Sequence, residues 1–215
     1  MLLYYITDRI QFAGDEDSQR RALLNKIAEA AACGIDFIQL REKDLPVRDL
    51  ESLARAAVQT IQENSEPKNQ QSRTRLLINS RVDVAIACGA DGVHLRSDDI
   101  PPRDVRSVWT VACGDSLPIV AVSCHTTADL ACAASEGADF AVFAPVFEKK
   151  DASSPPAAGL TALREACRQN IPVLALGGVN LKNARSCIEV GAAGVAGIRL
   201  FQERKIAEVV RILRH

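Results

Sequence analysis

Apolar and polar residues follow a pattern along the chain that repeats four times. The stretches "CGIDFIQL" (33–40), "CGADGVHL" (88–95), "EGADFAVF" (136–143) and "VGAAGVAGI" (190–198) each place a glycine early and end in a short apolar run. A glycine directly after a helix suits the left-handed conformation in which many helices end. Each stretch therefore predicts a helix end followed by a strand, with the caps at Gly34, Gly89, Gly137 and Gly191.

Other apolar runs lie between these repeats and bring the number of predicted strands to eight. Segments such as 18–33 and 48–64 separate the strands and carry apolar residues at helical spacing. Strand and helix alternate throughout, which favours a closed (β/α)₈ barrel over an open doubly wound sheet. We therefore predict an α/β fold, a TIM barrel that spans residues 1–215 as a single domain. The additional strands are "LLYYIT" (2–7), "RLLIN" (75–79), "PIVAVS" (118–123) and "PVLALGG" (172–178).

The composition limits the partners that the chain can have. A formal net charge of -1 and 4% aromatic residues argue against nucleic-acid binding. No run of about 18 apolar residues is present, and the N-terminus lacks the features of a signal peptide. Seven cysteines without a C-x-x-C pair predict reduced, mostly buried thiols and a cytoplasmic protein. The oligomeric state stays open, with a homodimer as one alternative.

The sequence "QLREKD" (39–44) ends the second predicted strand with two cations. Side chains alternate between the two faces of a strand, so Gln39, Arg41 and Lys43 share one face. Two cations on the interior face are costly unless an anion meets them. That anion is either a substrate or an acidic side chain such as Asp8 or Asp99, and we favour the substrate.

The ends of the last two predicted strands are rich in glycine. TIM barrels often bind phosphate at this place through main-chain N–H groups. Gly177 and Gly178 lack a β-carbon, so a phosphate oxygen can approach the main chain closely. The main chain at Ile198 and the side chain of Arg199 offer a second contact. The alternative is that the two glycines only form a tight turn between strand and helix.

Two further strand ends carry groups that suit catalysis. Asp99, with Asn79 nearby, could hold a magnesium ion that bridges phosphates, because hard cations prefer oxygen ligands. Ser123 and His125 end the fifth predicted strand. The imidazole of His125 titrates near neutral pH and suits a general acid or base, with a structural histidine as the alternative. We expect His94, in the middle of its strand, to serve packing.

The segment "EKKDASSPPAAG" (148–159) follows the sixth predicted strand, on the side where barrels place their chemistry. It is a candidate lid or binding loop. Lys149 and Lys150 could add positive charge to an anion site, although a solvated loop explains these two lysines equally simply.

Seven motifs together resemble the thiamine phosphate synthase and thiazole tautomerase superfamily. They are "YYITDR", "QLREKD", "LINSRVDVAIACGADGVHL", "VSCHT", "APVFEKKD", "LALGGVN" and "GVAGI", and they cover essentially the whole chain. The resemblance implies a (β/α)₈ barrel in thiamin biosynthesis that joins a pyrimidine diphosphate to a thiazole phosphate and releases pyrophosphate. Its substrates would be small phosphates and diphosphates.

The resemblance also implies roles for individual residues. Gln39, Arg41 and Lys43 would contact the pyrophosphate, with Lys149 in the place of the family's pyrophosphate lysine. Asn79 would hold the pyrimidine diphosphate, and Ser123 would lie against pyrophosphate or pyrimidine. Asp99 would bind Mg²⁺. The thiazole phosphate would lie on Gly177, Gly178 and the main chain of Ile198 and Arg199.

The sequence departs from the synthase pattern at several positions of the site. Ser80 stands where synthases usually carry a second magnesium-binding aspartate, and Arg96-Ser97 replaces a usual Gly-Gln. The Thr-x-Thr-Lys motif after the sixth strand has lost its threonines. These losses also resemble the tautomerase branch, in which His125 would move a proton on a thiazole carboxylate phosphate without magnesium. A barrel that binds thiamin phosphates without turnover is the third hypothesis. The retained "QLREKD" and Asp99 favour the synthase.

Overall fold

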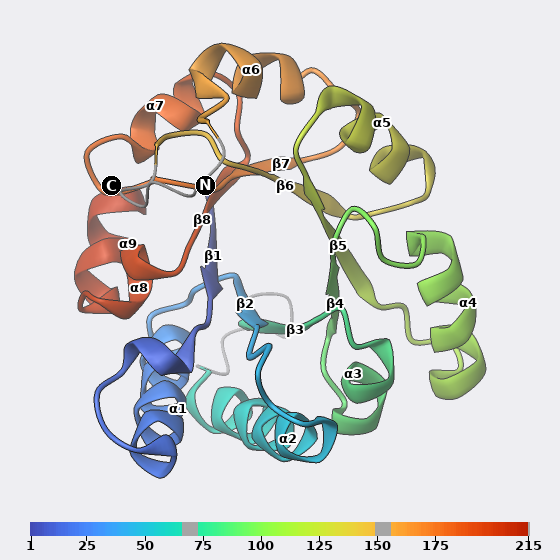
Figure 1. Ribbon diagram of the computed structural model, residues 1–215, viewed down its shortest axis with the longest axis vertical. Helices are drawn as coiled ribbons and strands as arrows, with labels where there is room; N and C mark the ends of the chain where they lie inside the picture. Colours follow the sequence, from blue (N-terminus) through green and yellow to red (C-terminus); the bar gives the residue numbers. More distant parts are fainter. Residues whose placement is uncertain (66–72, 149–155, 215) are drawn as a thin grey trace.

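The chain folds into a closed barrel of parallel strands in which each strand pairs with the next along the sequence and β8 pairs with β1 (Figure 1). The computed structural model describes residues 1–65, 73–148 and 156–214. The predicted (β/α)₈ barrel is thereby confirmed, and each strand coincides with a predicted apolar run. The strands are β1 Leu2–Ile6, β2 Phe37–Leu40, β3 Arg75–Asn79, β4 Gly92–Leu95, β5 Ile119–Cys124, β6 Phe140–Phe143, β7 Val173–Ala175 and β8 Gly194–Gly197.

Helices follow the strands and surround the barrel on its outside (Figure 1). The two helices predicted over 18–33 and 48–64 are present with closely similar bounds. No helix of the described residues is long and apolar enough to cross a membrane. The helices are η1 Arg9–Gln11, α1 Glu16–Ala32, α2 Val47–Asn64, α3 Val82–Cys88, α4 Pro102–Cys113, α5 Thr127–Ser135, α6 Gly159–Ala166, α7 Ala184–Glu189, α8 Arg199–Gln202 and α9 Ile206–Arg214.

The four predicted glycine caps adopt the backbone conformation for which glycine was expected. Gly34, Gly89, Gly137 and Gly191 all have positive φ angles, of 71°, 69°, 82° and 109°. Each lies one or two residues after the last residue of a helix and precedes the next strand. Because the same device recurs before β2, β4, β6 and β8, the sequence repeat reflects a repeat of structure.

The strands separate two apolar cores. Inside the barrel, a small cluster includes Tyr4, Leu77, Phe140 and Leu174, and the rings of Tyr4 and Phe140 meet edge to face at 5.6 Å between centroids. The larger core lies between the strands and the helices and includes Leu23, Ile38 and Phe201 among many others. Successive side chains of a strand therefore point alternately into the two cores. The interior core fills the barrel below its carboxyl end.

The cysteines follow the prediction only in part. All seven are free thiols, as expected. Cys88, Cys124 and Cys187 are buried, and burial raises the pKa of the Cys124 thiol to about 12. Cys113 and Cys132 are exposed on α4 and α5, so the expectation that the cysteines mostly fill the core is wrong for these two. Both lie on the outer face of a helix, where a small residue has no packing role.

Candidate active site

A cavity of about 850 Å³ opens at the carboxyl end of the barrel, and residues at or just beyond the ends of all eight strands line it. Asp99 lies outside its wall and lines a smaller neighbouring cavity of about 410 Å³. Lys149 and Lys150 lie outside the described residues. The predicted site residues in the wall of the large cavity are Gln39, Arg41, Lys43, Asn79, Ser123, His125, Gly177, Gly178, Ile198 and Arg199.

The end of β2 brings positive charge to this cavity. Gln39, Arg41 and Lys43 all line it, as the alternation predicts, whereas Glu42 turns to the other side and is buried. The alternative ion pair of Arg41 or Lys43 with Asp8 or Asp99 is not formed. The Arg41 guanidinium, with some burial and with Arg96, lowers the pKa of Lys43. Cations that repel one another in this way attract an anion.

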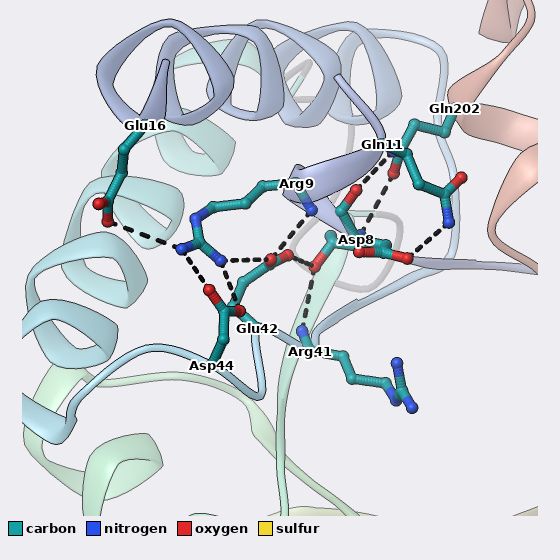
Figure 2. A network of polar contacts seen from close by, with 9 residues as sticks. Asp8, Arg9, Gln11, Glu16, Arg41, Glu42, Asp44 and Gln202 are labelled. Atoms are coloured by element: carbon teal, nitrogen blue, oxygen red, sulfur yellow. Dashed lines mark hydrogen bonds and ion pairs between the residues drawn. The ribbon is translucent and has the colours of Figure 1, made fainter. Parts of the chain in front are cut away.

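A buried polar network fixes the chain that carries these cations (Figure 2). The carboxylate of Glu42 accepts hydrogen bonds from Thr7 Oγ1 at 2.5 Å and from the main-chain N–H of Arg9 at 2.9 Å. Thr7 Oγ1 in turn accepts the main-chain N–H of Arg41 at 3.0 Å. Arg9 also forms a two-point ion pair with Asp44, at 2.7 and 2.6 Å. The segment after β2 is therefore held at both ends.

Figure 2 shows the guanidinium of Arg41 pointing away from this network, while its main chain takes part in it. Burial raises the pKa of Glu42, against the hydrogen bonds from Thr7 and Arg9 that lower it. Sequence reasoning gave no role to Thr7, Arg9 or Glu42. The signal was present in the alternation of "QLREKD", because a glutamate on the outward face of a buried strand needs partners.

The floor of the cavity contains a second buried chain of hydrogen bonds, from β1 through β4 to β5. The hydroxyl of Tyr4 lies 3.0 Å from Nδ1 of His94, and Nε2 of His94 lies 2.8 Å from Oγ of Ser123. His94 is buried, and burial lowers its pKa to about 3, so the ring is neutral at physiological pH. The expectation that His94 serves packing describes only part of its role. The ring also lines the cavity and forms a hydrogen bond with Ser123.

Asp99, the predicted metal ligand, already has several contacts. Its Oδ2 accepts hydrogen bonds from Ser80 Oγ at 2.6 Å and from the main-chain N–H of Arg96 at 2.8 Å. Its Oδ1 lies 3.5 Å from Nε of Arg96. Within the described part of the chain, no three His, Cys, Asp or Glu side chains are grouped to hold a metal ion. These donors fit a Mg²⁺ that takes most of its ligands from a diphosphate and water, and not a preformed metal site.

The glycines after β7 lie across the barrel from the cations. Gly177 and Gly178 have φ angles of 92° and 65°. A β-carbon on Gly178 would stand 2.7 Å from the carbonyl oxygen of Glu148, and one on Gly177 would stand 2.7 Å from Cα of Pro145. Both glycines are therefore required by the turn and by the close approach of the β6–α6 loop. They also line the cavity beside Ile198, so the turn and the ligand-binding interpretation are compatible.

His125 lies at the wall of the cavity with a defined tautomer. Its Nδ1 lies 2.7 Å from the carbonyl oxygen of Ala144. A carbonyl can only accept, so Nδ1 carries the hydrogen and Nε2 of the neutral ring keeps a lone pair. Asp129 fixes the main chain by accepting the N–H groups of His125 and Thr126. The nitrogen that a general base would use is therefore Nε2.

The comparisons with known proteins agree with this geometry. A family model described as thiamine monophosphate synthase matches residues 3–201. The chain belongs to this family. A thiamine-phosphate synthase of Roseiflexus sp. is 39% identical over 201 residues, which cover 92% of this chain and 76% of the relative. A thiamine-phosphate synthase of Methanoculleus marisnigri is 36% identical over 217 residues, covering 99% and 93%.

Solved structures place this member of the thiamine monophosphate synthase family among known barrels. Thiamine phosphate pyrophosphorylase from Pyrococcus furiosus superposes with a TM-score of 0.78 at 27% identity, over 99% of this chain and 93% of that one. A 3-hexulose-6-phosphate synthase at 17% identity and a TM-score of 0.70 shares the fold alone. The predicted family and fold are confirmed.

Proposed function

We propose that this family member is a thiamine-phosphate synthase that joins hydroxymethylpyrimidine diphosphate to thiazole phosphate and releases pyrophosphate. The observation that carries the proposal is the arrangement of one cavity with two anion-binding regions. Arg41 and Lys43 stand after β2, and Gly177 and Gly178 stand after β7. Strands β2 and β7 are three places apart in a closed ring of eight, so these regions lie on different sides of the cavity. Two anionic substrates can thus meet with their rings between them.

The charges of the site suit a dissociative transfer. The C–O bond to the diphosphate breaks, and pyrophosphate leaves with the electron pair. The thiazole nitrogen then donates its lone pair to the pyrimidine methylene cation and forms the C–N bond. Arg41 and Lys43 stabilise the negative charge that develops on the leaving group, and the cavity aligns the two rings. No nucleophilic side chain is required.

Magnesium remains part of the proposal as a partner of the diphosphate. Asp99 and the hydroxyl of Ser80 would hold the ion, which would neutralise charge on the leaving group. Arg96 contributes positive charge at the same place, because its guanidinium contacts both Asp98 and Asp99. The hydroxyl of Ser80 is a weaker magnesium ligand than a carboxylate would be. Arg96 adds a positive charge beside it.

A turnover assay with purified protein, both substrates and a magnesium titration tests the proposal. We expect magnesium-dependent formation of thiamin phosphate. Asp99→Asn should raise the magnesium concentration needed for half-maximal rate, and Ser80→Asp should lower it. Absence of product at saturating substrates and magnesium would refute the synthase.

One observation favours a second candidate. Nε2 of His125 carries a lone pair and its ring lines the cavity, which suits a thiazole tautomerase that moves a proton on thiazole carboxylate phosphate. His125→Gln distinguishes the two functions. It should abolish isomerisation if the protein is a tautomerase, and it should leave most of the coupling rate if the protein is a synthase.

We further propose that the protein works in the cytoplasm. The seven free thiols support this assignment, because exposed thiols such as Cys113 and Cys132 stay reduced there.

A further inference from the structure

Tyr4, His94 and Ser123 are linked by hydrogen bonds under the cavity. The buried hydroxyl of Tyr4 determines which group donates in each of these two hydrogen bonds. Tyr4 is completely buried, and its hydroxyl hydrogen needs an acceptor. Among the described residues, the hydrogen-bond partner of this hydroxyl is Nδ1 of His94. If Nδ1 carried a hydrogen, the ring would donate to Tyr4 and leave the phenolic hydrogen without an acceptor. A buried donor left unsatisfied is destabilising, which disfavours that arrangement.

The position of the hydrogen on the ring then follows. Tyr4 donates to Nδ1, so the neutral ring of His94 carries its hydrogen on Nε2. That N–H donates to Oγ of Ser123, at 2.8 Å. Burial holds the ring in its neutral form, since the pKa of His94 is lowered to about 3. Ser123 receives a hydrogen bond from below and keeps its own hydrogen for another acceptor.

We infer that Tyr4 and His94 are positioning residues that make Ser123 a hydrogen-bond donor into the cavity. The inference rests on the proposed function only for the identity of the ligand. It assigns a preference to the floor, where the hydrogen of the Ser123 hydroxyl needs an acceptor and the substrate atom that meets it should offer a lone pair. A ring nitrogen without hydrogen provides that lone pair, whereas an N–H group would leave the hydroxyl hydrogen without an acceptor.

The charge distribution favours an uncharged acceptor over a phosphate oxygen at this place. The cavity-lining side chains that belong to the strands themselves, as Ser123 does, are neutral or apolar, among them Gln39, Asn79, His94 and Ile6. The cations Arg41 and Lys43 belong to the segment beyond the end of β2. A phosphate is stabilised better beside those cations, and a heteroaromatic ring fits the neutral floor.

Nuclear magnetic resonance of the ligand-free protein tests the direction of the chain without any assay of activity. The chain has three histidines, and His94→Gln identifies the signals of His94. We expect long-range ¹H–¹⁵N spectra to show a protonated Nε2 and an unprotonated Nδ1 at neutral pH. A protonated Nδ1 would overturn the inference, and the synthase proposal would remain intact.

A double-mutant cycle tests whether Tyr4 acts through Ser123. Tyr4→Phe should lower kcat/KM about 5-fold, the value of one hydrogen bond of about 1 kcal/mol. In the background of Ser123→Ala, the same change should have no further effect. Additive effects of the two changes would overturn the positioning role.

The neighbouring tyrosine provides a matched control. Tyr5→Phe also removes a fully buried hydroxyl from β1, one that donates to Gln202 at 2.9 Å and has no link to Ser123. It should leave kcat/KM within about 2-fold, well below the loss expected for one hydrogen bond to Ser123. An equal loss in Tyr5→Phe and Tyr4→Phe would show that the effect of Tyr4 is one of stability alone, and would also overturn the inference.

Discussion

The two sides of the cavity present different groups to an anion. On the side of β2 to β4, the charge is carried by side chains, and Arg41 and Lys43 stand on a segment that a buried network fixes from below. On the side of β7 and β8, Gly177 and Gly178 offer main chain, and their conformation is set by positive φ angles and by the β6–α6 loop. A change on the first side alters charge with little effect on folding. A change on the second side alters the backbone and hence both binding and stability.

This difference predicts where substitutions are tolerated. On the side-chain side, contacts such as that of Ser80 with Asp99 can be exchanged for others. The glycine side leaves no such freedom, because a β-carbon would overlap Glu148 or Pro145. Substitutions on each side can therefore test whether the two regions are independent.

The largest expected effect concerns His94, in the floor that both regions share. Its pKa is about 3 in the folded protein, against about 6.5 for an unperturbed histidine. The unfolded chain therefore binds more protons between these values, so stability is complete above pH 6.5 and is lost as the pH falls toward 3. The full loss of unfolding free energy is about 5 kcal/mol, since one unit of pKa corresponds to about 1.4 kcal/mol.

Urea denaturation of wild type and His94→Gln across this pH range measures the contribution of His94. The stability difference between the two proteins should shrink on acidification, because glutamine does not titrate. Parallel pH profiles would contradict the neutral buried imidazole.

Loss of a cation on the side-chain side should be the next largest effect. Lys43→Ala should lower kcat/KM about 10²-fold, the usual cost of removing one preorganised electrostatic contact to a developing charge. Its unfolding free energy should change little, because Lys43 is exposed. Lys205→Ala is the control, since Lys205 is an exposed lysine that does not line the cavity. Equal activity in both variants would remove Lys43 from the site.

Gly178→Ala should show the opposite pattern, a loss of stability together with a loss of thiazole phosphate binding. Gly89 is a matched control, because its φ of 69° is close to the 65° of Gly178 while a β-carbon there meets no atom within 4 Å. Gly89→Ala should cost about 1 kcal/mol for the left-handed backbone. Gly178→Ala should cost roughly 1–3 kcal/mol more because of overlap with Glu148. Equal unfolding free energies of the two variants would show that the main chain at Glu148 moves to accommodate the new methyl group at little cost.

The sequence predicted the barrel and ten residues of the cavity wall, because strand ends and the faces of strands follow from periodicity. Alternation placed Gln39, Arg41 and Lys43 on one face, and the glycine caps marked the units of the fold. The side-chain hydrogen bonds between strands could not be predicted from the sequence. That Thr7 joins Glu42 to Arg41, or that Tyr4 reaches His94 across 90 positions, depends on the closure of the barrel. The contact of Asp99 with Ser80 could not be predicted either, since the fold brings these two residues together from neighbouring strands.

The smallest expected effect is a displacement of the alkaline limb of the pH profile of kcat/KM. This limb reports the free enzyme, and activity should fall as the pH rises through the pKa of Lys43. The charge of Arg41 lowers that pKa more than burial or Arg96 does. Arg41→Ala should therefore move the limb to higher pH although it lowers activity overall, and Arg96→Ala should move it in the same direction by less. Gly178→Ala should leave the limb in place, because it lies on the side without these charges. A limb that moves to lower pH in Arg41→Ala would contradict the effect of Arg41 on the pKa of Lys43, and a limb that moves in Gly178→Ala would show that the two sides of the cavity are not independent.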